Sequence, residues 1–204
     1  MAHLLHIDAS PRGDRSHSRK LSREFVEAWV AAHPGDKVTY RDLGHNPVPL
    51  VSEAWIAANY TPAEAQTPET RELLRISDEL IEELMAADIY VFGMPMYNFG
   101  VAAGFKAYID QVVRAGRTFT RPNMEGLLKG KKMYLAMAAG ADYAVGLPMA
   151  NYNHVLPYLR AVFGFVGVTD ITPIAVATAA GGEDLANFET KASKMITELV
   201  GSTR

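Results

Sequence analysis

The sequence contains no cysteine among its 204 residues. This absence excludes disulfide bonds, cysteine-ligated zinc, iron–sulfur clusters and thiol catalysis. If the protein carries out redox chemistry, a bound group rather than a side chain must therefore carry the electrons. The histidines also lack the spacing of a metal site, so no metal ligands are predicted.

Strong charge of one sign and long apolar runs are missing as well. The 20 Lys and Arg residues face 23 Asp and Glu residues, and no basic cluster is denser than Lys129, Lys131 and Lys132. Nucleic acid is therefore not expected as a partner. No apolar run reaches the roughly 18 residues of a membrane span, and His6 and Asp8 interrupt the apolar amino-terminal stretch. These features predict a soluble, cytoplasmic protein with neither a signal peptide nor a membrane partner.

Short aliphatic runs alternate with longer segments of helical period, which is typical of a parallel sheet covered by helices. Strands are predicted at 3–9, 38–43, 88–94, 133–138 and 171–177. Helices are predicted at 18–32, 68–85, 103–115, 153–163 and 184–200, with a stop at Gly116 and a break at Gly181 and Gly182. Prolines predict an irregular, partly helical excursion between the second strand and the second helix. The result is one domain over 1–204, an α/β three-layer sandwich with a five-stranded parallel sheet.

Hydroxyl side chains gather in the loop after the first predicted strand. This loop carries Ser10, Ser16 and Ser18 and leads into a helix. Hydroxyls, backbone amides and the positive end of a helix dipole together form a cradle for a phosphate. The glycine triplet of dinucleotide loops and the Gly-Lys-Ser signature are both absent. The serines could instead only cap the helix, and composition leaves both interpretations open.

Two further loops leave strands at the edge where ligands of parallel sheets bind. The loop after the third strand contains Tyr97, Asn98 and Phe99. Aromatic rings offer flat contact to a planar ligand, and an amide can donate and accept hydrogen bonds along its edge. An ordinary loop whose aromatic residues cover the core is the alternative. After the fourth strand, Gly140 lets the backbone approach a ring closely.

Short motifs along nearly the whole chain match one known family. They are Ser10 with Arg12, Ser16 and Ser18; Asp42, Leu43 and Pro47; Pro95-Met96-Tyr97-Asn98-Phe99; and the stretches 106–110, 114–116, 118–119, 126–132, 157–159 and 163–167. By these motifs the chain resembles the FMN-dependent NADH:azoreductases and NADH:quinone oxidoreductases, which are flavodoxin-like flavoproteins that act as homodimers. The stretch Pro-Met-Tyr-Asn-Phe is the specific signal.

The resemblance implies a set of cofactor-binding residues. Those at the FMN phosphate are Ser10, Ser16, His17 and Ser18. Those around the flavin ring are Met96, Tyr97, Asn98 and Phe99. Gly140 remains a backbone contact to the ring, although the loop from Ala138 to Tyr143 lacks the hydroxyl or arginine and the paired glycines usual in the family. Phe119 is a candidate for lining the slot of the electron acceptor, within one chain or across a dimer interface, and apolar packing is the alternative.

The implied reaction is a ping-pong exchange in which NADH or NADPH reduces the flavin, leaves, and is replaced by a quinone or an aromatic azo compound. The flavin carries the chemistry, so no side chain is predicted to be catalytic. An azo bond takes four electrons and therefore needs two rounds.

The main alternative is a flavodoxin-like single-electron carrier without substrate turnover of its own. Carriers that dock electrostatically favour a surface of one sign, whereas this chain has a net charge of −3 with both signs interspersed. A hydrolase with Ser10 as nucleophile is disfavoured because the Gly-x-Ser-x-Gly elbow is missing. A phosphoacceptor receiver domain is disfavoured because Asp88 opens its predicted strand instead of closing it.

Overall fold

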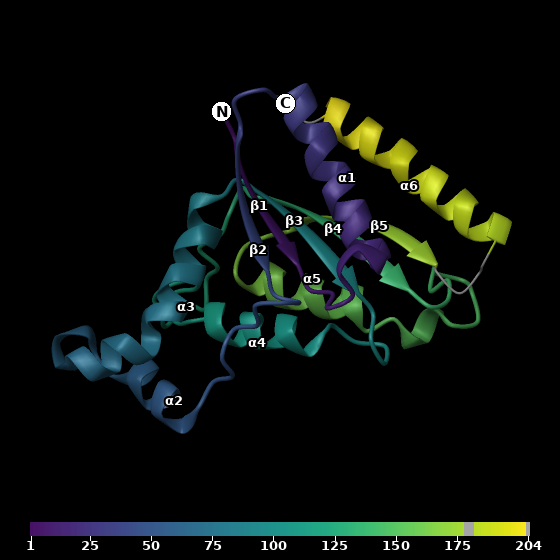
Figure 1. Ribbon diagram of the computed structural model, residues 1–204. Helices are drawn as coiled ribbons and strands as arrows, with labels where there is room; N and C mark the ends of the chain where they lie inside the picture. The colour runs from purple at the N-terminus through teal and green to yellow at the C-terminus, as the bar shows by residue number, and fades with distance from the viewer. Residues whose placement is uncertain (178–181, 203–204) are drawn as a thin grey trace.

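The computed structural model describes residues 1–177 and 182–202 (Figure 1). Within these residues, five parallel strands form one sheet in the order β2-β1-β3-β4-β5. The strands are β1 (His3–Asp8), β2 (Lys37–Asp42), β3 (Ile89–Pro95), β4 (Lys132–Ala139) and β5 (Asp170–Ala177). The predicted α/β architecture and parallel five-stranded sheet are confirmed.

Helices cover both faces of this sheet (Figure 1). One face carries α1 (His17–Ala32) and α6 (Gly182–Ser202). The other carries α3 (Pro68–Ala86), α4 (Ala103–Val112) and α5 (Val155–Phe165). The predicted excursion contains α2 (Glu53–Tyr60), which projects away from the sheet beside the start of α3. Over the described part of the chain, no helix combines the length and apolar character needed to cross a bilayer.

The sheet separates two hydrophobic cores because successive side chains of a strand point to opposite faces. In β1, Leu4 packs in the core under α1 and α6, and Leu5 packs in the core under α3, α4 and α5. All seven residues of β3 are buried, as expected for a central strand of a parallel sheet covered on both faces.

The helix boundaries differ from the sequence prediction in a few places. The helix predicted to reach residue 115 ends at Val112, because the Thr118 hydroxyl donates to the Val112 carbonyl at 2.8 Å and accepts from the Arg114 amide at 3.0 Å. Gly116 lies in the turn that follows, with φ of 77°. The helix predicted at 153–163 is α5, which spans Val155–Phe165, and Pro157 lies in its first turn, where a proline loses no helical hydrogen bond. The break predicted at Gly181 lies outside the described residues.

The strand order places a topological switch point between β1 and β3. The chain leaves β1 toward β2 on one side of the sheet, and β3, β4 and β5 follow on the other side. At the carboxyl edge, Asp8 pairs in register with Gly93, and Pro95 pairs with Ala138. The loops after β1, β3 and β4 therefore begin side by side, which is where ligands bind in such sheets.

Candidate functional site

The three loops enclose a cavity of about 230 Å³. Its lining residues are Ser10, Arg12, Ser16, His17, Pro95, Met96, Tyr97, Ala138, Ala139 and Gly140. Six of the nine predicted cofactor-binding residues are in this set, from all three loops. Ser18, Asn98 and Phe99 are not, and Arg12, Pro95, Ala138 and Ala139 were not predicted. Arg12 lies in the serine loop between Ser10 and Ser16, so its place in that motif could have identified it as a cavity residue.

At one end of the cavity, the helix cap and the hydroxyl cluster are the same structure. Ser16 is the N-cap of α1, and its Oγ accepts from the Arg19 amide at 3.4 Å. The Ser18 hydroxyl lies behind the cap, 3.1 Å from the Ser16 Oγ, and is fully buried. The Nδ1 of His17 lies 3.4 Å from the Glu189 carboxylate of α6. A helix amino terminus surrounded by hydroxyls suits a phosphate group.

At the other end, a tight turn presents the aromatic residues. Tyr97 and Gly100 exchange backbone hydrogen bonds of 3.1 and 3.0 Å, and between them Asn98 and Phe99 adopt φ of 47° and 70°. The Tyr97 hydroxyl lies 3.4 Å from the Ser10 Oγ and so joins this turn to the serine loop. Asn98 and Phe99 occupy the tip of the turn, where the Phe99 ring packs on Tyr152 at 5.2 Å.

The loop after β4 leaves open space beside the cavity. The Met96 amide donates to the Ala138 carbonyl at 2.8 Å, which fastens this loop to the aromatic turn. A Cβ atom built on Gly140 would meet no atom of the described residues within 4 Å. Met96 and Ala139 also line an adjoining, mostly apolar cavity of about 410 Å³. The cavity thus has a hydroxyl-rich end that suits a phosphate, and its other end has room for a flat ring. The residues present therefore fit FMN.

A buried charge cluster beneath the serine loop was missed at the sequence level. Asp8 and Asp42 end neighbouring strands, and Arg19 lies between them with 5% of its surface exposed. Burial opposes ionisation of Asp42, but hydrogen bonds from Arg19 and His45 outweigh it and hold the pKa of that carboxyl well below its usual range. Burial and the neighbouring carboxylates raise the pKa of Tyr40 to about 12. The available signal in the sequence was a carboxylate near the carboxyl end of each of the first two predicted strands, at Asp8 and Asp42.

Phe119 is placed away from the candidate site. The turn after α4 carries it to the end of α5, where its ring packs on Phe165 at 4.8 Å. Among the described residues of one chain it lines neither of the two adjoining cavities. Backbone pairing with Ala115 and Gly126 holds Phe119 in this turn. Phe119 therefore does not belong to the cavity within a single chain.

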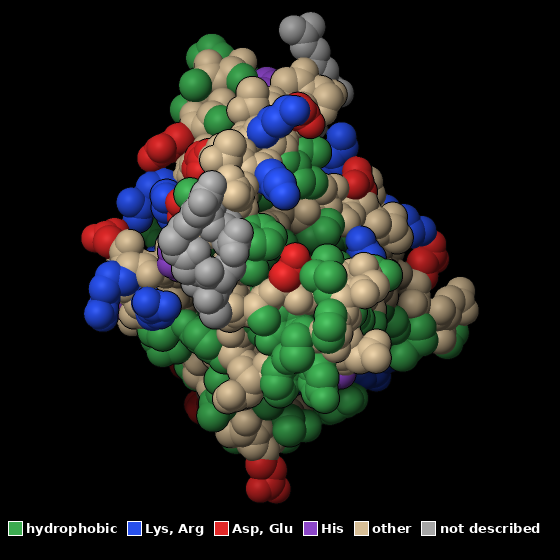
Figure 2. Space-filling model, turned by 90° about the vertical axis from the view of Figure 1, so that its right-hand side faces the viewer, with side chains coloured by type: hydrophobic (Ala, Val, Ile, Leu, Met, Phe, Trp, Pro, Cys, Tyr) green, Lys and Arg blue, Asp and Glu red, His purple; other side chains and the backbone are tan. Residues whose placement is uncertain are grey.

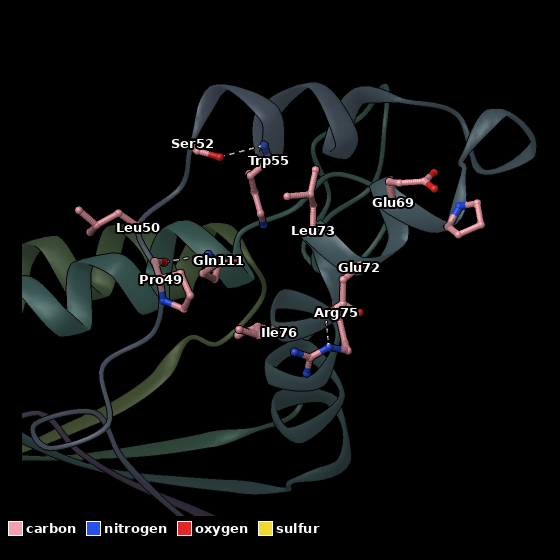
Figure 3. Close-up of a pocket in the computed structure, with 11 residues that line it drawn as sticks. Pro49, Leu50, Ser52, Trp55, Glu69, Glu72, Leu73, Arg75, Ile76 and Gln111 are labelled. Atoms are coloured by element: carbon pink, nitrogen blue, oxygen red, sulfur yellow. Dashed lines mark hydrogen bonds and ion pairs between the residues drawn. The ribbon is translucent and has the colours of Figure 1, made fainter.

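A larger cavity of about 770 Å³ lies elsewhere, between α2, α3 and the end of α4 (Figure 3). Trp55 reaches it from α2, and Gln111 reaches it from α4, where the Gln111 side-chain amide donates to the Pro49 carbonyl at 2.9 Å. Its lining includes none of the nine predicted cofactor-binding residues and no residue of the carboxyl edge of the sheet. Volume alone therefore does not identify the functional site of this chain.

Comparison with known proteins agrees with this geometry. A family model described as a flavodoxin-like fold matches residues 2–199. The chain belongs to this family. It is 56% identical over 173 residues to the "FMN-dependent NADH:quinone oxidoreductase" of Nostoc punctiforme, covering 84% of each chain. It is 41% identical over 203 residues to the protein of the same name from Herminiimonas arsenicoxydans, covering 98% of this chain and 99% of that one.

A solved structure extends the agreement to three dimensions. The azoreductase from Bacillus anthracis strain Sterne superposes with a TM-score of 0.89 at 26% identity, over 100% of both chains. The family resemblance inferred from the motifs and the flavodoxin-like fold are therefore confirmed.

Proposed function

We propose that this chain is an FMN-dependent oxidoreductase that passes electrons from NADH or NADPH to quinones and to aromatic azo compounds. The observation that carries the proposal is the cavity at the switch point, which joins a capped helix amino terminus to an aromatic turn. Relatives covering most of this chain are named for the same cofactor, donor and quinone substrate. No observation favours a single-electron carrier.

The residues of the chain bind and orient the cofactor. FMN, when bound, supplies the hydride and electron transfer. Ser10, Ser16 and the amino terminus of α1 hold the phosphate, with His17 and Ser18 beside them. Met96, Tyr97, Asn98 and Phe99 orient the ring, and Gly140 leaves its approach open. Apolar groups of the adjoining cavity exclude water and offer flat contact to planar acceptors.

Assembly and location belong to the same proposal. We propose that residues 1–204 form one FMN-binding domain, that two copies form a homodimer, and that the enzyme works in the cytoplasm, where NADH is available. The loop after β4 exposes Val145, Leu147 and Tyr152, next to exposed Phe99. Figure 2 shows hydrophobic side chains gathered over the lower part of the face at which β4 and β5 end. Such a patch supports contact with a second copy.

The decisive experiment is anaerobic reduction of the purified, FMN-loaded protein. We expect tight binding of added FMN, bleaching of the flavin absorption by NADH or NADPH without any partner protein, and reoxidation by a quinone. Steady-state rates with both nicotinamides, a quinone panel and an azo dye then identify the donor and acceptor. A protein that takes up no FMN would overturn the flavin assignment. Slow reduction by nicotinamides with fast reduction by one-electron donors would instead favour the carrier.

A further inference from the structure

A buried arginine lies under the loop that is proposed to hold the phosphate. Arg19 stands in the first turn of α1, and its Nε donates to the Ser10 carbonyl at 2.7 Å. A cation in this position opposes the helix dipole, and a buried guanidinium needs partners to offset its lost hydration. The local structure of α1 therefore gives no reason for an arginine here, and the reason must lie in what its side chain holds.

Carboxylates hold the guanidinium in one orientation. Both of its terminal nitrogens donate to Asp42, Nη1 to Oδ2 at 2.9 Å and Nη2 to Oδ1. Nη1 also donates to the Tyr40 hydroxyl at 3.1 Å and lies 3.8 Å from the Asp8 carboxylate. A forked pair of this kind sets the plane of the guanidinium as well as its position. With both terminal nitrogens engaged, Nε faces the Ser10 carbonyl.

A glycine shows how closely the chain packs around that carbonyl. A Cβ atom built on Gly44 would lie 2.1 Å from the Ser10 oxygen and 2.6 Å from Nη2 of Arg19. The loop after β2 therefore packs directly against both this oxygen and the guanidinium, and only a glycine fits at residue 44. A larger residue there would displace the Ser10 carbonyl or Arg19.

The orientation of Ser10 matters because Ser10 lines the cavity at its hydroxyl-rich end. Its Oγ accepts from the Arg12 amide at 3.3 Å and lies 3.4 Å from the Tyr97 hydroxyl. A carbonyl oxygen facing the cavity would repel a phosphate, whereas a carbonyl held on Arg19 leaves hydroxyls and amides on the cavity side. Arg19 itself is absent from the residues described as lining the cavity.

We propose that Arg19 is a positioning residue that sets the affinity for the FMN phosphate by holding the Ser10 carbonyl away from it. This inference rests on the proposed function, because it takes FMN as the ligand. It assigns to Arg19, Asp42 and Gly44 a shared role in shaping the serine loop from beneath. The role concerns the phosphate end alone and leaves the ring end unchanged.

Riboflavin, which is FMN without the phosphate, separates this role from a general structural one. We expect Arg19→Gln to raise the Kd for FMN roughly tenfold, the scale of one lost charge-assisted hydrogen bond, and to change the Kd for riboflavin less than about twofold. Fluorescence titration of the purified protein with each flavin measures the ratio of the two constants. Equal weakening of both flavins, or no change in either, would overturn the inference.

Two matched variants test whether the position of the Arg19 guanidinium or only its charge sets the ratio of the two Kd values. Arg23→Gln removes the same charge one turn later on α1, from a side chain that is 58% exposed, and should leave the ratio unchanged. Arg19→Gln combined with Asp42→Asn keeps the net charge and should still lose the preference for FMN. A double variant with the wild-type ratio would show that Arg19 acts by charge and would contradict the positioning role.

A variant that does not fold, and a failure of the proposed function, can each be distinguished from a failure of this inference. If Arg19→Gln does not fold, Arg19→Lys keeps the charge without the fork and should show a smaller loss of the same ratio. An unchanged ratio in a folded Arg19→Lys protein would then overturn the inference. If the wild-type protein binds neither flavin, the proposed function itself fails, which is a different result from wild-type binding with an insensitive Arg19.

Discussion

At the scale of single residues, the tip of the aromatic turn holds an unusual backbone. Asn98 and Phe99 both have positive φ, a conformation that asparagine tolerates and a bulky aromatic residue rarely adopts. Paired left-handed residues are typical of a tight turn between two backbone hydrogen bonds. Backbone strain of this kind concentrates at ligand sites. The conformation is held by the Tyr97–Gly100 pair and by the Phe99 carbonyl, which accepts from the His154 amide at 3.1 Å.

Two substitutions at Asn98 separate its backbone from its side chain. Alanine removes the amide and tolerates positive φ poorly, so Asn98→Ala should lose about 1 kcal/mol of stability and weaken FMN binding. Glycine removes the amide but accepts the backbone, so Asn98→Gly should keep the melting temperature and weaken FMN to the same extent. Thermal melts without flavin and FMN titrations measure the two effects. Wild-type FMN affinity in Asn98→Gly would remove the side chain from the site.

At the scale of elements, three helices begin with the same local chemistry but different surroundings. Ser16, Ser52 and Thr67 cap α1, α2 and α3, each with its side-chain oxygen accepting from an amide three residues later. Of these caps, only Ser16 is described as lining the cavity at the carboxyl edge of the sheet. The cap is therefore general, and its use as a ligand site depends on where the sheet places it.

A comparison of two caps tests this distinction. Ser16→Ala with Ser18→Ala should lower stability by about 1 kcal/mol or more, because a cap is lost, and should also raise the Kd for FMN. Ser52→Ala removes a cap whose Oγ accepts from the Trp55 amide at 3.2 Å and should lower stability without changing the Kd. Denaturant melts of both proteins measure the loss of stability, and FMN titrations measure the Kd. An unchanged Kd in the double variant would leave Ser16 and Ser18 as helix caps only.

At the scale of the whole molecule, one sheet joins the two hydrophobic cores. Phe92 of β3 contacts Phe105 and Phe163 at ring distances of 5.5 and 5.6 Å on one face. On the other face, Phe25 of α1 packs on Tyr134 of β4 at 4.5 Å. Because β3 and β4 are neighbours, loss of packing on either face must disturb the same sheet. This coupling supports a single cooperative domain.

Thermal unfolding tests both the single domain and the homodimer. Phe92→Ala and Phe25→Ala, on opposite faces, should each cost about 3 to 5 kcal/mol and lower one common transition by roughly 2 to 4 °C per kcal/mol. In the wild type, the midpoint should rise with protein concentration, because dimer formation stabilises the folded state by mass action. Calorimetry at several concentrations measures both. Two separate transitions would contradict a single domain, and a midpoint independent of concentration would contradict a stable dimer.

Much of the fold could be predicted because it depends on local patterns. The aliphatic runs of β1 and β3 and the amphipathic stripe of α3 place strands and helices to within a few residues. The end of α4 could not be placed, because a side chain from beyond the helix, Thr118, terminates it. The structure of the excursion between β2 and α3 could not be predicted for a similar reason. Arg114 ties α2 to α3 by donating to Asn59 and Asp78, a contact between segments distant in the sequence.

The sequence by itself determined that no cysteine could carry redox chemistry, that a parallel sheet would form, and that serines and a Tyr-Asn-Phe turn would stand at its carboxyl edge. These are consequences of residue type, periodicity and motif, all of which are local. Only the tertiary structure decided that the Ser10 and Tyr97 hydroxyls meet, that Phe119 lies away from the cavity of its own chain, and that Arg19 is buried between two carboxylates. Those facts depend on the packing of strands and loops that are far apart along the chain. The spacing of residues in the sequence does not determine which of these distant segments come into contact.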